Sequence, residues 1–102
     1  MAARLMVLYP PPVDPETFEA AYLTKHIPLM RRLVGKDGRL SFWKVVSAGA
    51  GPPPFYRIAE IEFASMEGLR GFIRSDETGE GRTSSEAIST GGLPQFLLCE
   101  DG

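Results

Sequence analysis

Residues 18–29, FEAAYLTKHIPL, form the most informative part of this chain of 102 residues. Steps of four residues place Phe18, Tyr22 and His26 along one face of a predicted helix. His26 is the only histidine of the sequence, and an imidazole beside two aromatic rings is a candidate for proton transfer or ligand binding near neutral pH. The competing interpretation is a histidine that only caps its helix or packs against other side chains.

The helix that carries His26 is predicted to begin at residues 14–16, DPE, and to reach residues 24–26. An acidic N-cap followed by proline at the first helical position favours this start. Pro28 has no N–H to donate to the carbonyl of Thr24, and its ring crowds that turn. Ile27 precedes the proline and is therefore expected outside helical dihedral angles. We expect a kink or break beside His26, with or without a further helical turn after it.

Four strands and a second helix are predicted around this segment. The strands are expected at residues 5–9, 40–46, 56–63 and 96–99. The second helix begins after an N-cap at Ser65. Residues 75–92 are polar and contain Gly79 and Gly81, so only weak helical content is expected there. The order β-α-β-β-α-β predicts an α+β, ferredoxin-like fold with an antiparallel sheet.

The strands carry apolar residues on both faces of the predicted sheet. In the first strand, Met6 and Leu8 point opposite to Leu5, Val7 and Tyr9. Both helices of such a fold cover the same face, and a large uncovered apolar face is unusual on a monomer. We therefore expect a homodimer in which two sheets meet face to face.

Composition excludes several classes of function. The net charge of −2 provides no basic field for nucleic acid or an anionic membrane, and no apolar run is long enough to span a bilayer. One cysteine and one histidine do not make a zinc site, and no nucleotide-binding or serine hydrolase motif is present. We expect a single domain over residues 1–102, located in the cytoplasm, with no cofactor and no metal.

Two stretches resemble a known family, the EthD proteins associated with ethyl tert-butyl ether degradation. The first is YPPPVDPETFEAAYLTKHIPLMRRLVG, residues 9–35, and the second is TGGLPQFLLCED, residues 90–101. The first contains the signature Tyr-x-x-x-His-x-Pro-Leu at Tyr22, His26, Pro28 and Leu29. The glycines at 79 and 81 depart from the short helix that the family usually carries between residues 75 and 90.

The resemblance implies a dimeric α+β barrel of ferredoxin-like subunits with a small apolar cavity in each. Related folds include cofactor-free monooxygenases, polyketide cyclases, lactone isomerases and decarboxylating lyases. The EthD members linked to ether degradation accompany a cytochrome P450 system, and their own chemistry is not established. Fold alone does not decide among these activities.

Two residues are candidates for catalysis, and six more for a ligand pocket. His26 is expected to exchange a proton with a carbonyl, enol or phenol at a pKa near 6.5. Tyr22, one turn earlier, is expected to donate a hydrogen bond to the same ligand oxygen. The predicted pocket residues are Tyr9, Phe18, Trp43, Phe63, Met66 and Phe72. Core packing alone also explains these aromatic and apolar residues, because pocket walls and core have the same composition.

Three functions fit these observations. The first is an EthD-like protein that binds a small hydrophobic organic compound within oxidative degradation or aromatic metabolism and catalyses a cofactor-free acid–base reaction through His26. The second is a non-catalytic binding protein or an accessory of an ether-degrading redox system. The third is a purely structural dimer module, which predicts solid packing between helices and sheet.

Overall fold

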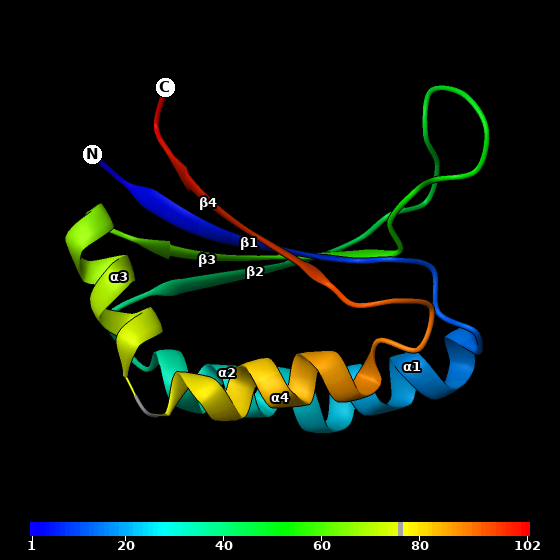
Figure 1. Cartoon of the computed structure of the whole chain (residues 1–102), viewed down its shortest axis with the longest axis horizontal. Helices are drawn as coiled ribbons and strands as arrows, with labels where there is room; N and C mark the ends of the chain where they lie inside the picture. The colour runs from blue at the N-terminus through cyan, green and yellow to red at the C-terminus, as the bar shows by residue number, and fades with distance from the viewer. Residues whose placement is uncertain (76) are drawn as a thin grey trace.

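One antiparallel sheet, with strand order β2-β3-β1-β4, forms a layer above the helices in this computed structural model (Figure 1). The structure describes every residue of the chain except Asp76. The elements in chain order are β1 (Ala3–Tyr9), α1 (Pro15–Ala21), the π-helical segment η1 (Tyr22–His26), α2 (Ile27–Val34), β2 (Arg39–Lys44), β3 (Arg57–Phe63), α3 (Met66–Arg74), α4 (Thr78–Ile88) and β4 (Gln95–Glu100). The predicted order of strands and helices is therefore confirmed.

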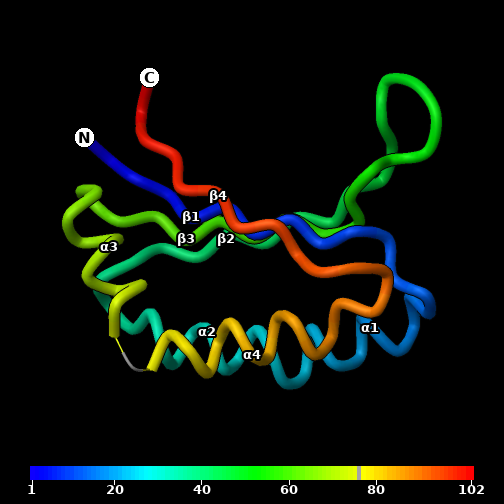
Figure 2. The backbone as a smooth tube through the Cα atoms, viewed as in Figure 1, coloured from blue at the N-terminus to red at the C-terminus, as the bar shows by residue number. Residues whose placement is uncertain are grey.

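The core lies between the sheet and the helices. β1 is central, pairs with β3 and β4, and buries every second residue from Ala3 to Tyr9. In β3, Ala59, Ile61 and Phe63 face the same core, which confirms the predicted alternation. The two chain ends lie close together at one end of the molecule (Figure 2). There the Asp101 N–H donates a hydrogen bond to the backbone carbonyl of Ala2.

The predicted disturbance beside His26 takes the form of the π-helical segment η1 rather than a break, and the helix continues through Pro28 into α2. Asp14 caps α1 as predicted, with its carboxylate accepting from the Glu16 N–H at 3.1 Å. The helix then widens into η1, where the Ile27 N–H donates to the Tyr22 carbonyl. Ile27 keeps helical angles (φ −60°, ψ −46°), so the prediction for it was wrong. The wider turn removes the α-helical pattern at the position where proline cannot donate.

The second helical unit has two parts, α3 and α4. The predicted N-cap of α3 is confirmed, because the Ser65 hydroxyl accepts from the Gly68 N–H at 3.1 Å. α4 corrects the expectation of weak helical content in residues 75–92. Gly81 lies against α2, where a Cβ would come within 2.9 Å of the Met30 sulfur and 3.1 Å of a Leu33 methyl carbon. Close packing of α4 on α2 thus outweighs the intrinsic cost of glycine in a helix.

Two glycines of α4 form a matched pair for testing this packing. A Cβ at Gly79 would meet nothing within 4 Å. We expect Gly79→Ala to raise the free energy of unfolding by about 0.5–1 kcal/mol, because alanine favours the helix. Gly81→Ala is expected to lower it by about 1 kcal/mol through overpacking. Urea unfolding of both variants measures the difference, and equal stabilisation by the two would contradict the packing role of Gly81.

The sheet face opposite the helices is uncovered in the single chain. Trp43 on β2 is 57% exposed and Leu97 on β4 is 47% exposed. Arg4 crosses this face to Glu60 at 3.4 Å and Glu62 at 3.7 Å. The connector of residues 45–56 rises on the same side (Figure 1). Among the described residues, none of the helices has the length and apolar character needed to cross a membrane.

Candidate functional site

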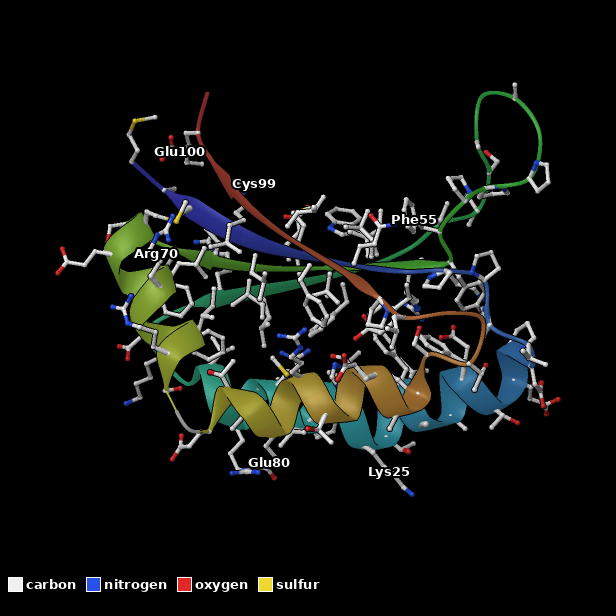
Figure 3. All side chains as sticks on the ribbon, in the orientation of Figure 1. Lys25, Phe55, Arg70, Glu80, Cys99 and Glu100 are labelled. Atoms are coloured by element: carbon white, nitrogen blue, oxygen red, sulfur yellow. The ribbon has the colours of Figure 1, made fainter. Side chains whose placement is uncertain are left out.

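A cavity of about 190 Å³ lies between the sheet and the helices. Its walls are mostly aliphatic and aromatic side chains that the strands and α3 bring together, including Val7, Ala59, Ile61, Phe72 and Phe96. The side chains in this space are visible between the two layers in Figure 3. The structural-module interpretation predicted solid packing, and this cavity argues against it.

Three polar side chains from three different elements meet at the wall of this apolar cavity. The hydroxyl of Tyr9, at the end of β1, lies 3.1 Å from Nε2 of His26, at the end of η1. Ser85 of α4 completes the group, with its Oγ 3.1 Å from the Tyr9 hydroxyl and 3.3 Å from the same Nε2. All three side chains are buried and line the cavity. Their convergence provides hydrogen-bonding groups in an otherwise apolar space.

The other ring nitrogen of His26 also has a partner. Nδ1 lies 2.9 Å from the hydroxyl of Ser84. A neutral imidazole has one donor and one acceptor nitrogen. Because a phenol is a stronger hydrogen-bond donor than acceptor, the Tyr9 hydroxyl favours Nε2 as the acceptor, either directly or through Ser85. Nδ1 then carries the proton, and this N–H donates a hydrogen bond to the Ser84 hydroxyl.

Burial controls the charge of this group. Desolvation lowers the pKa of His26 from its ordinary 6.5 to about 4, which corrects the expected pKa near 6.5. Burial also raises the pKa of Tyr9 to about 12, an effect that the hydrogen bond with Ser85 partly offsets. At neutral pH the cavity therefore holds a neutral imidazole and a protonated phenol.

Aromatic stacking fixes the orientation of the imidazole. Tyr22 stacks on His26 at 5.7 Å between ring centroids and on Phe18 at 5.2 Å. The guanidinium of Arg57 lies 5.0 Å from the centroid of the Tyr22 ring. Glu19 holds this guanidinium through two hydrogen bonds of 2.8 and 3.1 Å. The predicted face of residues 18, 22 and 26 is thus a stack that supports the histidine.

The predicted site residues fall into two groups. His26, Tyr9 and Phe72 line the cavity. The other five lie outside its lining. Trp43 is on the opposite sheet face. The other four pack in or against the core: Phe18, Tyr22, Phe63 and Met66. The Tyr22 hydroxyl is buried without a hydrogen-bond partner among the described residues, and burial raises its pKa.

The predicted site did not include Ser84, Ser85 and Arg82, which lie in the segment expected to be weakly helical. Thr78, Gly81 and Ser85 are spaced three and four residues apart and share the cavity-facing side of α4. This stripe of small residues was the available signal. It could not be interpreted without knowing that the segment is helical. Within the described part of the chain, no three potential metal ligands cluster.

The buried imidazole makes stability depend on pH. An unfolded histidine takes up a proton near pH 6.5, whereas folded His26 resists protonation until about pH 4. The unfolded state therefore binds more protons between these values, and stability falls as the pH falls. We expect a loss of about 3 kcal/mol between pH 8 and pH 4 from this residue.

Urea unfolding of the wild-type chain and of His26→Gln across this pH range isolates the contribution. Glutamine does not titrate, so other groups affect both proteins alike. As the pH falls, the free energy of unfolding of the wild-type chain should decrease relative to that of His26→Gln. Parallel curves would show that His26 is not held neutral by burial.

Fold and cavity together define a class: a ferredoxin-like α+β protein with a buried, mainly apolar cavity. Residues 10–82 match the EthD domain, and the chain belongs to the EthD family. An uncharacterized 11.0 kDa protein in the thcB–thcC intergenic region of Rhodococcus erythropolis is 26% identical over 98 residues, which are 96% of this chain and 94% of the relative. The predicted family resemblance is therefore confirmed.

Solved structures agree with this assignment. An EthD family protein from Bacillus halodurans is 25% identical, with a TM-score of 0.87 and full coverage of both chains. A dimeric ferredoxin-like protein of unknown function from Jannaschia shares 8% identity at a TM-score of 0.76, covering 99% of this chain and all of that one. The cofactor-independent oxygenase SnoaB from Streptomyces nogalater shares 12% at a TM-score of 0.63, covering 98% and 92%. The Jannaschia protein and SnoaB show similarity of fold alone. The predicted ferredoxin-like α+β fold is confirmed.

Proposed function

We propose that this EthD protein binds a small, mainly apolar organic molecule in the cavity, as part of oxidative degradation or aromatic metabolism, and transforms it without a cofactor. The observation that carries the proposal is the meeting of Tyr9, His26 and Ser85 at the wall of an apolar cavity of about 190 Å³. A dry apolar cavity of ~150 Å³ is large enough to bind benzene. A compound with one ring and one oxygen substituent fits this description.

His26 is the proposed acid–base residue. Its low pKa means that it is neutral when the ligand arrives and accepts a proton only if a negative charge forms beside it. An enolate or a phenolate is such a charge. Tyr9 donates to its oxygen by turning its single O–H away from Ser85 or Nε2, which leaves Nε2 free to accept the proton. Isomerisation, cyclisation, lyase reactions and oxygenation can each proceed through such a proton removal when the substrate carries an acidic C–H or O–H group. The cofactor-independent activity of SnoaB, which has the same fold, supports this group of reactions.

A second candidate is a non-catalytic binding protein, or an accessory of an ether-degrading redox system. The observation in its favour is that both ring nitrogens of His26 already have hydroxyl partners. Such partners also satisfy a buried imidazole that performs no chemistry. The enzyme and the non-catalytic binding protein require the same ligand cavity.

A ligand screen tests the shared requirement. Ethers, phenols, quinones and lactones are compared by the rise in melting temperature that binding produces by mass action. Ala59→Leu fills the cavity, since Ala59 is buried in its wall, whereas Ala20→Leu makes the same change on an exposed position of α1. Stabilisation should persist in the Ala20 variant and be lost in the Ala59 variant. Equal stabilisation of both would place binding elsewhere and refute the proposal.

We also propose that two copies pair through the uncovered sheet faces. The exposed Trp43 and Leu97 on that face support this, as does the dimeric state of the Jannaschia protein with the same fold. Sedimentation at micromolar concentration should give twice the chain mass of 11.2 kDa. Trp43→Glu should yield monomers, whereas Leu23→Glu, a similarly exposed position on η1, should leave the dimer intact. A wild-type chain that sediments only as a monomer would refute this proposal.

A further inference from the structure

One charged side chain reaches the cavity lining. Arg82 of α4 lines the cavity, yet its side chain is 67% exposed, so it lies where the cavity meets solvent. Its guanidinium lies over the ring of Phe96, 5.3 Å from the centroid, and Phe96 is itself part of the lining. No other lysine or arginine belongs to this lining among the described residues.

Among the residues that the structure describes, the hydrogen-bonding capacity of Arg82 is largely unused. The one acid within 4 Å there, Glu86, lies 3.8 Å away on the same helix and is itself partly exposed. Arg57, in contrast, donates two bonds to Glu19 at 2.8 and 3.1 Å. A guanidinium offers five N–H donors in a planar fork that suits a carboxylate. Arg82 therefore presents free donors at the mouth, with a flat aromatic surface below them.

The two polar ends of the cavity are close enough for one small molecule to reach both. Arg82 and Ser85 are three residues apart on α4, which separates their Cβ atoms by about 5–6 Å. Phe96 pairs with Val7 on β1, two residues before Tyr9 on the same strand face. Tyr9 and Arg82 thus line one cavity from neighbouring positions of β1 and α4, with the Phe96 ring beneath the guanidinium.

We propose that the cavity is specific for a ring compound carrying both a hydroxyl or carbonyl oxygen and a carboxylate, with Arg82 binding the carboxylate at the mouth and Tyr9 and His26 binding the oxygen inside. This inference rests on the proposed function, because it assigns a substrate class to the same cavity. It makes Arg82 a specificity-determining residue rather than a catalytic one.

The test compares the affinities of 4-hydroxybenzoate and its methyl ester, measured by calorimetry on the full chain. The ester keeps the ring and the hydroxyl but removes the negative charge. We expect the acid to bind about threefold to tenfold more tightly, the range for a charge-assisted bond at a partly exposed site. Added salt should reduce the preference, because exposed ion pairs are screened.

Two variants locate the preference. Arg82→Gln should weaken acid binding to the level of the ester and leave the ester unchanged. Glu86→Gln removes the competing acid and should strengthen acid binding by about twofold or threefold. If acid and ester bind equally to the wild-type chain, or if Arg82→Gln lowers both affinities alike, the carboxylate assignment is refuted while the cavity proposal stands. If neither compound binds, both proposals are refuted for single-ring ligands.

Discussion

Replacing His26 with glutamine should lower turnover of the cavity ligand by about 10²–10⁴-fold while leaving its affinity within a few-fold of the wild-type value. Glutamine fills much of the imidazole volume and still offers hydrogen-bonding groups to Tyr9 and Ser84. It cannot accept a proton at neutral pH, so only the acid–base step is lost. The comparison uses a compound from the screen that the wild-type chain transforms, with rate and dissociation constant measured separately.

His26→Ala is the matched comparison. Alanine also removes the base, but it leaves the hydroxyls of Tyr9, Ser84 and Ser85 without their nitrogen partners and enlarges the cavity. We expect the same loss of turnover together with a loss of stability of about 2–4 kcal/mol. Unchanged turnover in both variants would remove the catalytic role and leave the binding protein as the better description.

Gly91→Ala should destabilise the fold by about 3 kcal/mol or more. Gly91 precedes β4 in the Thr-Gly-Gly segment, where a Cβ would stand 1.8 Å from the Pro11 carbonyl oxygen and 3.3 Å from Cα of Pro12. Both obstacles are backbone atoms, so no side-chain rotation relieves the clash. The Val13 N–H donates to the Thr90 hydroxyl at 3.1 Å and ties the two segments together.

The control is Gly71→Ala on α3, where a Cβ would meet nothing within 4 Å. Alanine in a helix interior should raise stability there by about 0.5–1 kcal/mol. The midpoints of urea unfolding for the two variants should therefore move in opposite directions. If the Gly91→Ala variant is as stable as the wild-type chain, then Gly91 does not lie against the backbone of Pro11 and Pro12.

Much of the fold could be predicted from local patterns. The alternation in β3 placed Ala59, Ile61 and Phe63 on one face because half-buried strands have a period of two residues. The caps at Asp14 and Ser65 were visible because their side-chain oxygens accept from N–H groups only two or three residues away. Such features depend on neighbours in the sequence, which a single sequence contains.

The rest depended on contacts between distant segments. Gly81 suggested a weak helix, but its missing side chain lets α4 approach Met30 and Leu33. Pro28 suggested a break, but the π-helical turn before it accommodates the missing donor. In both cases the local rule was sound, and a tertiary or hydrogen-bonding arrangement that the rule does not include outweighed it.

In the candidate site, too, local features could be predicted and contacts between distant segments could not. Periodicity placed Tyr22 beside His26, and the structure stacks them. The partners that determine the chemistry of the imidazole are Ser84 and Ser85, 58 and 59 residues further along the chain. Its low pKa likewise comes from burial, which no local pattern measures. The histidine could be found from the sequence, whereas its protonation state could not.

Nitrogen NMR of the imidazole tests both the protonation state of His26 and its contact with a ligand. The chain has a single histidine, so selective ¹⁵N labelling of histidine gives the signals of His26 alone. We expect a neutral ring at pH 7, protonated at Nδ1. Its Nε2 signal should shift on addition of a compound that raises the melting temperature, with the same dissociation constant. A ring that is charged at pH 7, or signals that stay unchanged while such a compound saturates the protein, would refute the proposed role of His26.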